Sequence, residues 1–142
     1  MIQPQELRIG NYLNEEVLGT CIVSQITEKT IWVLTNNLKE DGTQNKREFH
    51  IWIKHLQPIP ITEDELIKLG FKKYNNGDYW INLQTHYLEL MYSNGFWYPT
   101  YAQIDGFLYY DTTAGTLNCI KYIHQLQNLY FVLTNKELRY NE

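Results

Sequence analysis

Residue types that usually build catalytic or metal sites are scarce in this chain of 142 residues. The two serines, Ser24 and Ser93, lie outside any Gly-x-Ser-x-Gly turn, and no glycine-rich phosphate loop is present. No two histidines are three or four residues apart, so the helical zinc motif is missing: His50, His55, His86 and His124. We therefore expect no enzyme, no catalytic residue, no cofactor and no metal ion.

Cysteine and long apolar runs are also scarce. Cys21 and Cys119 are the only cysteines, which is typical of a protein in a reducing cytosol. The first residues carry neither a basic run nor an apolar core, and no apolar stretch has the length of a membrane span. These absences predict a cytoplasmic protein that is neither exported nor embedded in a membrane.

The first sixty residues contain short runs of alternating character with turn residues between them. Strands are expected at 20–26, 30–35 and 46–53, the last with Phe49, Ile51 and Ile53 inward and His50 outward. Asp41-Gly42 is expected to form a hairpin turn. The number and spacing of the strands predict a small SH3-like β-barrel over residues 1–61.

Residues 62–142 are expected to form one unit of a helix, an antiparallel sheet and a carboxy-terminal helix, which makes the fold α+β. Thr62 and Glu65 form a capping box, Gly70 ends the short helix, and Glu63-Asp64-Glu65 fits its positive amino end. Strands are predicted at 79–83, 87–92, 96–101 and 107–110, with turns at Asn76-Gly77 and Asn94-Gly95. The last helix is predicted over 119–133, with four residues toward the core: Ile123, Leu126, Tyr130 and Leu133.

Basic residues are missing from a long central segment. Between residues 74 and 120 there is no lysine or arginine, although the net charge of the whole chain is only −4. The same segment holds four acids and most of the aromatic residues: Asp78, Glu89, Asp105 and Asp111 are the acids. Turn formation explains the aspartates, and the spacing proposes no catalytic acid pair, although it leaves one open.

Three interpretations of the aromatic residues compete. Most are expected to be core and cross-strand pairs. Stacking on nucleic-acid bases is the second, but without lysine or arginine nearby the phosphates would not be neutralised. The third is a protein-binding patch with an acidic rim, which suits a basic partner. We favour the third for those rings that face outward.

Three segments carry a resemblance to a known pattern: 7–12 (LRIGNY), 58–63 (PIPITE) with 69–71 (LGF), and 122–131 (YIHQLQNLYF). In these segments the chain resembles the uncharacterised small proteins that prophages and mobile elements of Bacteroidetes-type bacteria encode. It departs mildly at Asn135, where glycine is more usual. No site is established in that family, so the resemblance transfers no residue. The resemblance implies that the protein acts in the cytoplasm of a bacterial host and that it serves a mobile element.

The sequence therefore predicts an accessory protein that acts by binding a basic host or defence protein, including nucleoprotein targets. Inhibitors of RNA-guided nucleases are one such class, because those nucleases have basic channels. The predicted partner-binding residues lie in the aromatic segment: Trp97, Tyr98, Tyr101, Asp105 and Asp111. The alternative is a nucleic-acid-binding protein that uses basic residues gathered at the amino-terminal barrel: Lys46, Arg47, Lys54, Lys72 and Lys73.

Overall fold

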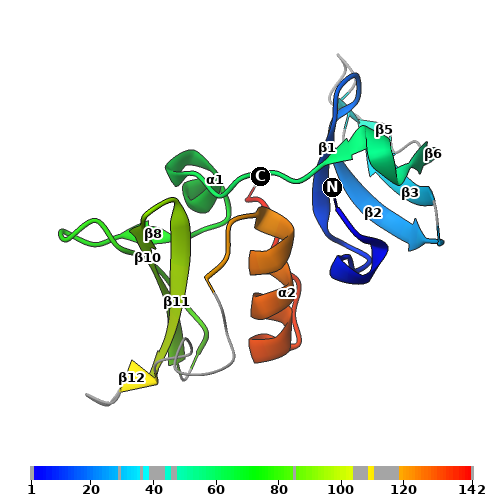
Figure 1. The fold of residues 1–142 in the computed structure, drawn as a ribbon. Coiled ribbons are helices and arrows are strands. Elements are labelled where there is room, and N and C mark those ends of the chain that lie inside the picture. Colours follow the sequence, from blue (N-terminus) through cyan, green and yellow to red (C-terminus); the bar gives the residue numbers. More distant parts are fainter. Residues whose placement is uncertain are drawn as a thin grey trace. The chain divides into compact units, whose positions relative to one another are not determined.

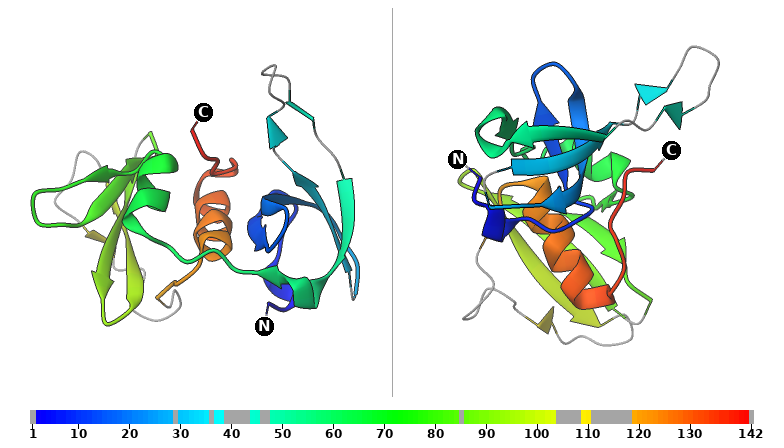
Figure 2. Two further views of the ribbon diagram at one scale, coloured as in Figure 1. Left: turned by 90° about the horizontal axis from the view of Figure 1, so that it is seen from above. Right: turned by 90° about the vertical axis from the view of Figure 1, so that its right-hand side faces the viewer.

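The computed structural model describes residues 2–28, 30–35, 37–38, 44–45, 48–84, 86–103, 109–110 and 119–141. It is an α+β structure with two helices and two larger antiparallel sheets (Figures 1 and 2). The chain divides into two compact units. The first contains residues 1–60 and 122–132, and the second contains residues 61–121 and 133–142.

The first unit is built on a five-stranded antiparallel sheet with the order β6-β3-β2-β1-β7. A 3₁₀ turn, η1 (Pro4–Glu6), precedes the sheet, and a second one, η2 (Ile53–His55), connects β6 to β7. The strands of this sheet are β1 (Tyr12–Glu15), β2 (Gly19–Ile26), β3 (Thr30–Thr35), β6 (Glu48–Trp52) and β7 (Leu56–Gln57). A separate pair of short strands, β4 (Asn37–Leu38) and β5 (Gln44–Asn45), extends beyond the sheet in Figure 2.

Alternation along these strands produces the core of the first unit. Cys21, Val23, Ile31 and Val33 are buried on one face of β2 and β3, as period-two patterning requires. The inward residues expected for the strand at 46–53 are confirmed, because Phe49 and Ile51 of β6 and Ile53 at the start of η2 pack against this core. Within the described residues the sheet stays open, so the expected closed barrel is not present. The predicted turn at Asp41-Gly42 lies outside the described residues.

Helix α2 (Ile123–Thr134) begins four residues later than the sequence indicated. Ile123 and Leu126 are fully buried as predicted, whereas Tyr130 and Leu133 are only half-buried. The predicted stripe missed three buried residues of the helix: His124, Gln127 and Leu129. Asn135 has a φ of 56° directly after the helix, the left-handed conformation that is common for the residue following a helix.

A buried amide network joins α2 to the segment before β1. Gln127 accepts a hydrogen bond from the Tyr12 backbone N–H at 2.8 Å and donates one to the Gly10 carbonyl at 3.1 Å. Asn11 donates to the side chain of Asn128 at 2.9 Å. Buried amides need such partners, so the contacts explain why polar residues occupy these positions. The segments 7–12 and 122–131 are thus structural partners.

His124 of this helix makes the stability of the protein depend on pH. Burial lowers the pKa of the His124 imidazole from its usual 6.5, although Glu6, 3.7 Å away, acts in the opposite direction. The unfolded chain therefore takes up this proton at a higher pH than the folded chain does. The contribution to stability is complete above about pH 6.5 and is lost as the pH falls through the folded-state pKa.

We expect the free energy of unfolding to decrease as the pH is lowered from about 7 to about 5. His124→Gln should show a smaller decrease, because it lacks the titrating group. Urea unfolding of both proteins across this range measures the difference. Equal slopes for the two proteins would show that His124 does not titrate differently on folding.

Helix α1 (Glu63–Lys68) opens the second unit, and its ends follow the sequence prediction. The Thr62 side chain accepts a hydrogen bond from the Glu65 backbone N–H at 3.3 Å, which caps the amino end. At the other end Gly70 donates to the Ile67 carbonyl and Phe71 to the Leu66 carbonyl, both at 3.0 Å. These two bonds form a Schellman motif, which needs a left-handed residue at position 70.

Substitution of Gly70 by alanine is expected to destabilise the second unit. Gly70 has a φ of 94°, and a Cβ there would lie 3.2 Å from the Nδ2 atom of Asn141. Gly77 is a matched control, since its φ of 92° is similar but a Cβ at that position would have nothing within 4 Å. Left-handed backbone costs about 1–2 kcal/mol for a residue with a Cβ. Chemical denaturation should show that cost for Gly77→Ala and a larger one for Gly70→Ala.

The second sheet is antiparallel with the order β12-β11-β10-β9-β8. Its strands are β8 (Lys72–Lys73), β9 (Tyr79–Asn82), β10 (His86–Ser93), β11 (Phe96–Gln103) and β12 (Tyr109–Tyr110). Both predicted hairpin turns are confirmed by positive φ angles, at Gly77 and at Asn94 with Gly95. The sequence did not indicate β8, which places two lysines on the edge of this sheet.

The units differ from the expected division in two respects. The first division follows Pro60, one residue before the expected boundary, and residues 122–132, which include most of α2, group with the first sheet and not with the second. Residues 133–142 group with the second unit, where the Asn141 N–H donates to the Lys68 carbonyl at 2.7 Å. The chain therefore passes between the two units more than once.

Candidate binding site

Alternation along β10 and β11 gives the second sheet two different faces. Leu88 and Leu90 are fully buried, together with Trp97 of the neighbouring strand, and this side is called the buried face. The side chains that alternate with these along the strands point to the other side of the sheet and form the outer face. There Met91 is 48% and Phe96 is 40% exposed. The outer face also carries four half-buried residues: Trp80, Tyr87, Glu89 and Tyr98.

Glu89 is the central acid of the outer face. It lies directly opposite Trp80 on β9 and opposite Thr100 on β11, so these side chains share a face. The rings of Trp80 and Tyr87 meet edge to face with their centroids 6.3 Å apart, and Tyr74 stacks on Trp80 at 5.5 Å. The carboxyl group therefore lies beside a set of aromatic rings that restrict its access to water.

A second carboxyl group, that of Asp78, lies close enough to the Glu89 carboxyl for the two to share a proton. Burial raises the pKa of Glu89, and the hydrogen bond and the negative charge of Asp78 raise it further. Asn76 fixes Asp78, because its amide donates to the carboxylate at 3.0 Å and its Oδ1 accepts from the Asp78 backbone N–H at 3.0 Å. Two carboxyl groups this close together favour the binding of a cation, because its positive charge would relieve the repulsion between them.

The structure separates the three aromatic residues that were predicted to bind a partner. Trp97 is only 7% exposed, and its indole Nε1 donates a hydrogen bond to the Ile61 carbonyl at 3.2 Å. The expectation that Trp97 is an exposed anchor is therefore wrong, because successive residues of a strand point to opposite faces. Tyr98 lies on the outer face. Tyr101 lies on the same face as Trp97, where its ring stacks on His86. Asp105 and Asp111 lie outside the described residues.

The predicted basic cluster is distributed over the two units. Lys54 is exposed in η2 of the first unit, whereas Lys72 and Lys73 are exposed on β8 of the second. The assignment of the last two to the amino-terminal sheet is therefore wrong. Lys46 and Arg47 lie outside the described residues. The ammonium of Lys72 lies 5.4 Å from the Trp80 ring centroid, so a cation already contacts the margin of the outer face.

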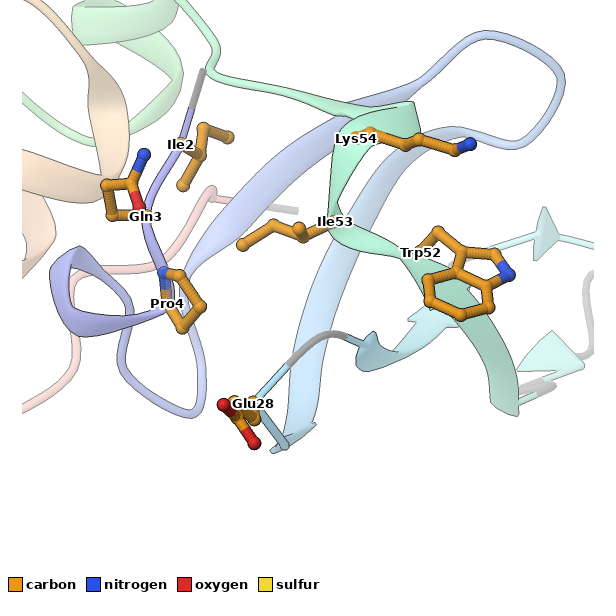
Figure 3. Close-up of a pocket in the computed structure, with 7 residues that line it drawn as sticks. All are labelled: Ile2, Gln3, Pro4, Glu28, Trp52, Ile53 and Lys54. Carbon is orange, nitrogen blue, oxygen red and sulfur yellow. The ribbon is translucent and has the colours of Figure 1, made fainter.

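A shallow pocket of about 290 Å³ lies in the first unit (Figure 3). Its residues come from the amino-terminal segment, from the loop after β2 and from the end of β6 with η2: Ile2, Gln3, Pro4, Glu28, Trp52, Ile53 and Lys54. In Figure 3 Ile53 points toward residues 2–4, whereas Trp52 and Lys54 point away from them. The polar groups of this pocket do not converge, so it supports no chemistry beyond apolar contact.

Side chains that could hold a metal ion do not gather in the described part of the chain. Among those residues no cluster of three or more histidine, cysteine, aspartate or glutamate side chains is placed to hold a metal ion. Cys21 and Cys119 are free thiols, and burial raises the pKa of Cys21 to about 11, with Glu15 adding to the shift. Neither described helix has the length and apolarity that a membrane crossing requires.

Comparisons with known proteins add no further assignment. No protein-family model matches the chain, no curated protein matches it, and no solved structure matches it.

Proposed function

We propose that the protein is a non-enzymatic binding protein and that the outer face of the second sheet binds a basic segment of another protein. The observation that carries this proposal is the Asp78–Glu89 carboxyl pair beside the aromatic rings of β9 and β10. A guanidinium or ammonium group seated there would compensate the two acids and lie against ring faces at the same time.

The residues around the Asp78–Glu89 pair are of the types that form binding hot spots in protein interfaces. Tyrosine and tryptophan supply a large contact area at a small cost in rotamer entropy, and Met91 and Phe96 extend that area toward solvent. Lys72 and Lys121 already lie 5.4 Å and 5.9 Å from the rings of Trp80 and Phe96. Because Trp80 lies directly opposite Glu89, a ring beside the acidic pair already accepts a cation, which supports the proposed role.

The resemblance to prophage and mobile-element proteins supports a host or defence protein as the partner. RNA-guided nucleases belong to the proposed targets, because their channels for nucleic acid are strongly basic. The acidic pair would compete with phosphates for such a channel. The cytoplasm of the bacterial host is the compartment that this proposal requires.

The first unit is proposed to be an SH3-like barrel in an open form. Support comes from the strand order, in which four strands follow one another and β7 returns to pair with β1. The 3₁₀ turn η2 immediately before β7 also agrees with that architecture. The fold by itself implies no activity.

Reversal of charge at Glu89 tests the binding proposal. We expect the parent protein to capture specific proteins from host lysate that Glu89→Lys fails to capture. Glu16→Lys is the matched control, because Glu16 is exposed in the first unit, and it should capture the same proteins as the parent. Circular dichroism verifies that both variants fold. Equal capture by parent and Glu89→Lys would exclude the outer face as the binding surface.

One observation favours nucleic-acid binding as a second candidate function. Trp32 and His50 stack at 4.5 Å on the solvent side of the first sheet, and Trp52 is 55% exposed. Such rings are suited to stacking on unpaired bases. Glu48 lies on the same side, where it accepts hydrogen bonds from Ser24 and Gln25, and its charge opposes phosphate. Fluorescence quenching by single-stranded DNA at physiological salt, abolished by Trp32→Ala, would establish this function.

A further inference from the structure

A second pocket, on the buried face of the second sheet, has a different composition. It is open to solvent and has a volume of about 410 Å³, within the size range of small-molecule sites. We call it the aromatic pocket, and it is lined by Ile61, Thr62, Glu63, Lys73, Gly77, Tyr79, Tyr92 and Trp97. All of these residues belong to the second unit.

Three aromatic rings form the walls of this pocket. The Tyr79 and Trp97 rings meet edge to face with centroids 5.8 Å apart, and Tyr92 lies tilted against Trp97 at 5.0 Å. Tyr79 and Trp97 are buried, and the indole hydrogen bond to the Ile61 carbonyl fixes the tryptophan. Tyr92 is 58% exposed, so it forms the open side. Gly77 contributes no side chain that would fill the space.

One carboxylate, that of Glu63, completes the lining. A hydrogen bond from Tyr79 and the ion pair with Lys73 lower the pKa of Glu63, so its negative charge persists at neutral pH. The Lys73 ammonium lies 3.0 Å from this carboxylate and 5.8 Å from the Tyr79 ring centroid. An ammonium group of the chain itself thus already makes the two contacts that the pocket offers to a cation.

We propose that the aromatic pocket binds an alkylated ammonium group, such as a choline-type head group or an N-methylated lysine side chain. Ring faces attract such cations through their quadrupoles, and the methyl groups prefer the apolar walls to water. The Lys73–Glu63 pair is exposed, and exposed ion pairs are weak, so a ligand can displace Lys73. This site is independent of the outer face and does not rest on the proposed partner.

Titration with tetramethylammonium chloride, followed by NMR of the backbone and indole N–H groups, tests the proposal. We expect saturable shifts at the Trp97 indole and at residues around the pocket, with sodium chloride as the control for ionic strength. Tyr92→Ala and Glu63→Gln, both at exposed positions, should each weaken binding about fivefold. Lys73→Met should tighten it, because it removes the internal competitor.

Choline and a trimethyl-lysine peptide, titrated separately, identify the source of the ammonium group by their relative affinities. Absence of saturable shifts with tetramethylammonium would overturn the proposal. It would also be overturned by binding that Tyr92→Ala and Glu63→Gln leave unchanged, or by weaker binding to Lys73→Met than to the parent.

Discussion

Trp97→Ala is expected to lower the free energy of unfolding by about 3–5 kcal/mol, the usual cost of removing a buried tryptophan. The indole is 7% exposed and packs between the rings of Tyr79 and Tyr92. Its loss would leave a cavity beside these rings and remove the hydrogen bond to the Ile61 carbonyl, which is 3.2 Å long. Guanidinium unfolding of the purified variant measures the change.

Tyr98→Ala is the control for this prediction, because Tyr98 follows Trp97 directly and points to the opposite face. We expect a cost of about 1 kcal/mol or less, as for most residues that are not fully buried. A Trp97 variant as stable as the Tyr98 variant would mean that the buried face is not the core of the second unit.

Leu126→Ala is expected to cost about 2–5 kcal/mol, because the side chain is fully buried in α2, in the part of the helix that belongs to the first unit. The neighbouring amide of Gln127 is anchored by hydrogen bonds to Tyr12 and Gly10, so the helix has little freedom to move into the cavity. A cavity that cannot collapse places the cost in the upper part of the range.

Val132→Ala on the same helix provides the comparison, since Val132 is 80% exposed. Its substitution should change the free energy of unfolding by no more than about 0.5 kcal/mol. Thermal denaturation of both variants measures the pair. Similar midpoints for Leu126→Ala and the parent would show that α2 is peripheral to the fold.

Local signals in the sequence were sufficient for the ends of α1 and for the hairpin turns of the second sheet. Thr62, Gly70 and the Asn94-Gly95 pair act through their own backbone and nearest neighbours, so their roles follow from residue type and spacing. The strand at 30–35 was likewise predicted with its observed bounds, because β-branched and aromatic residues cluster there. These features do not depend on which distant elements meet.

The features that the sequence did not predict depend on contacts with other segments of the chain. Gln127 is buried because Tyr12 and Gly10 supply partners more than a hundred positions away, and a polar residue without a known partner is expected outside. Lys72 and Lys73 were interpreted as cations of the first half of the chain, because the two-residue strand β8 gives no periodic signal. Their pairing with β9 became visible only in the structure.

The candidate site was predicted as a region, whereas its residues were only partly identified. An acidic and aromatic sheet between residues 74 and 110 is present, and Tyr98 belongs to its outer face. Strict alternation from the apolar Leu88 and Leu90 would have assigned Glu89 and Tyr87 to that face and Trp97 to the other. The hydrogen bond between Asp78 and Glu89 depends on the β9–β10 register, which the sequence does not specify.

The affinity of the Tyr98→Ala variant for the captured partner is the most direct test of the outer face as the binding surface. Isothermal titration calorimetry should show binding weakened more than tenfold relative to the parent, with Trp32→Ala in the first unit unchanged. The parent should show no measurable affinity for free single-stranded DNA or RNA at physiological salt. Tyr98→Ala with parental affinity, alongside Trp32→Ala with weakened affinity, would contradict the account and assign binding to the first sheet.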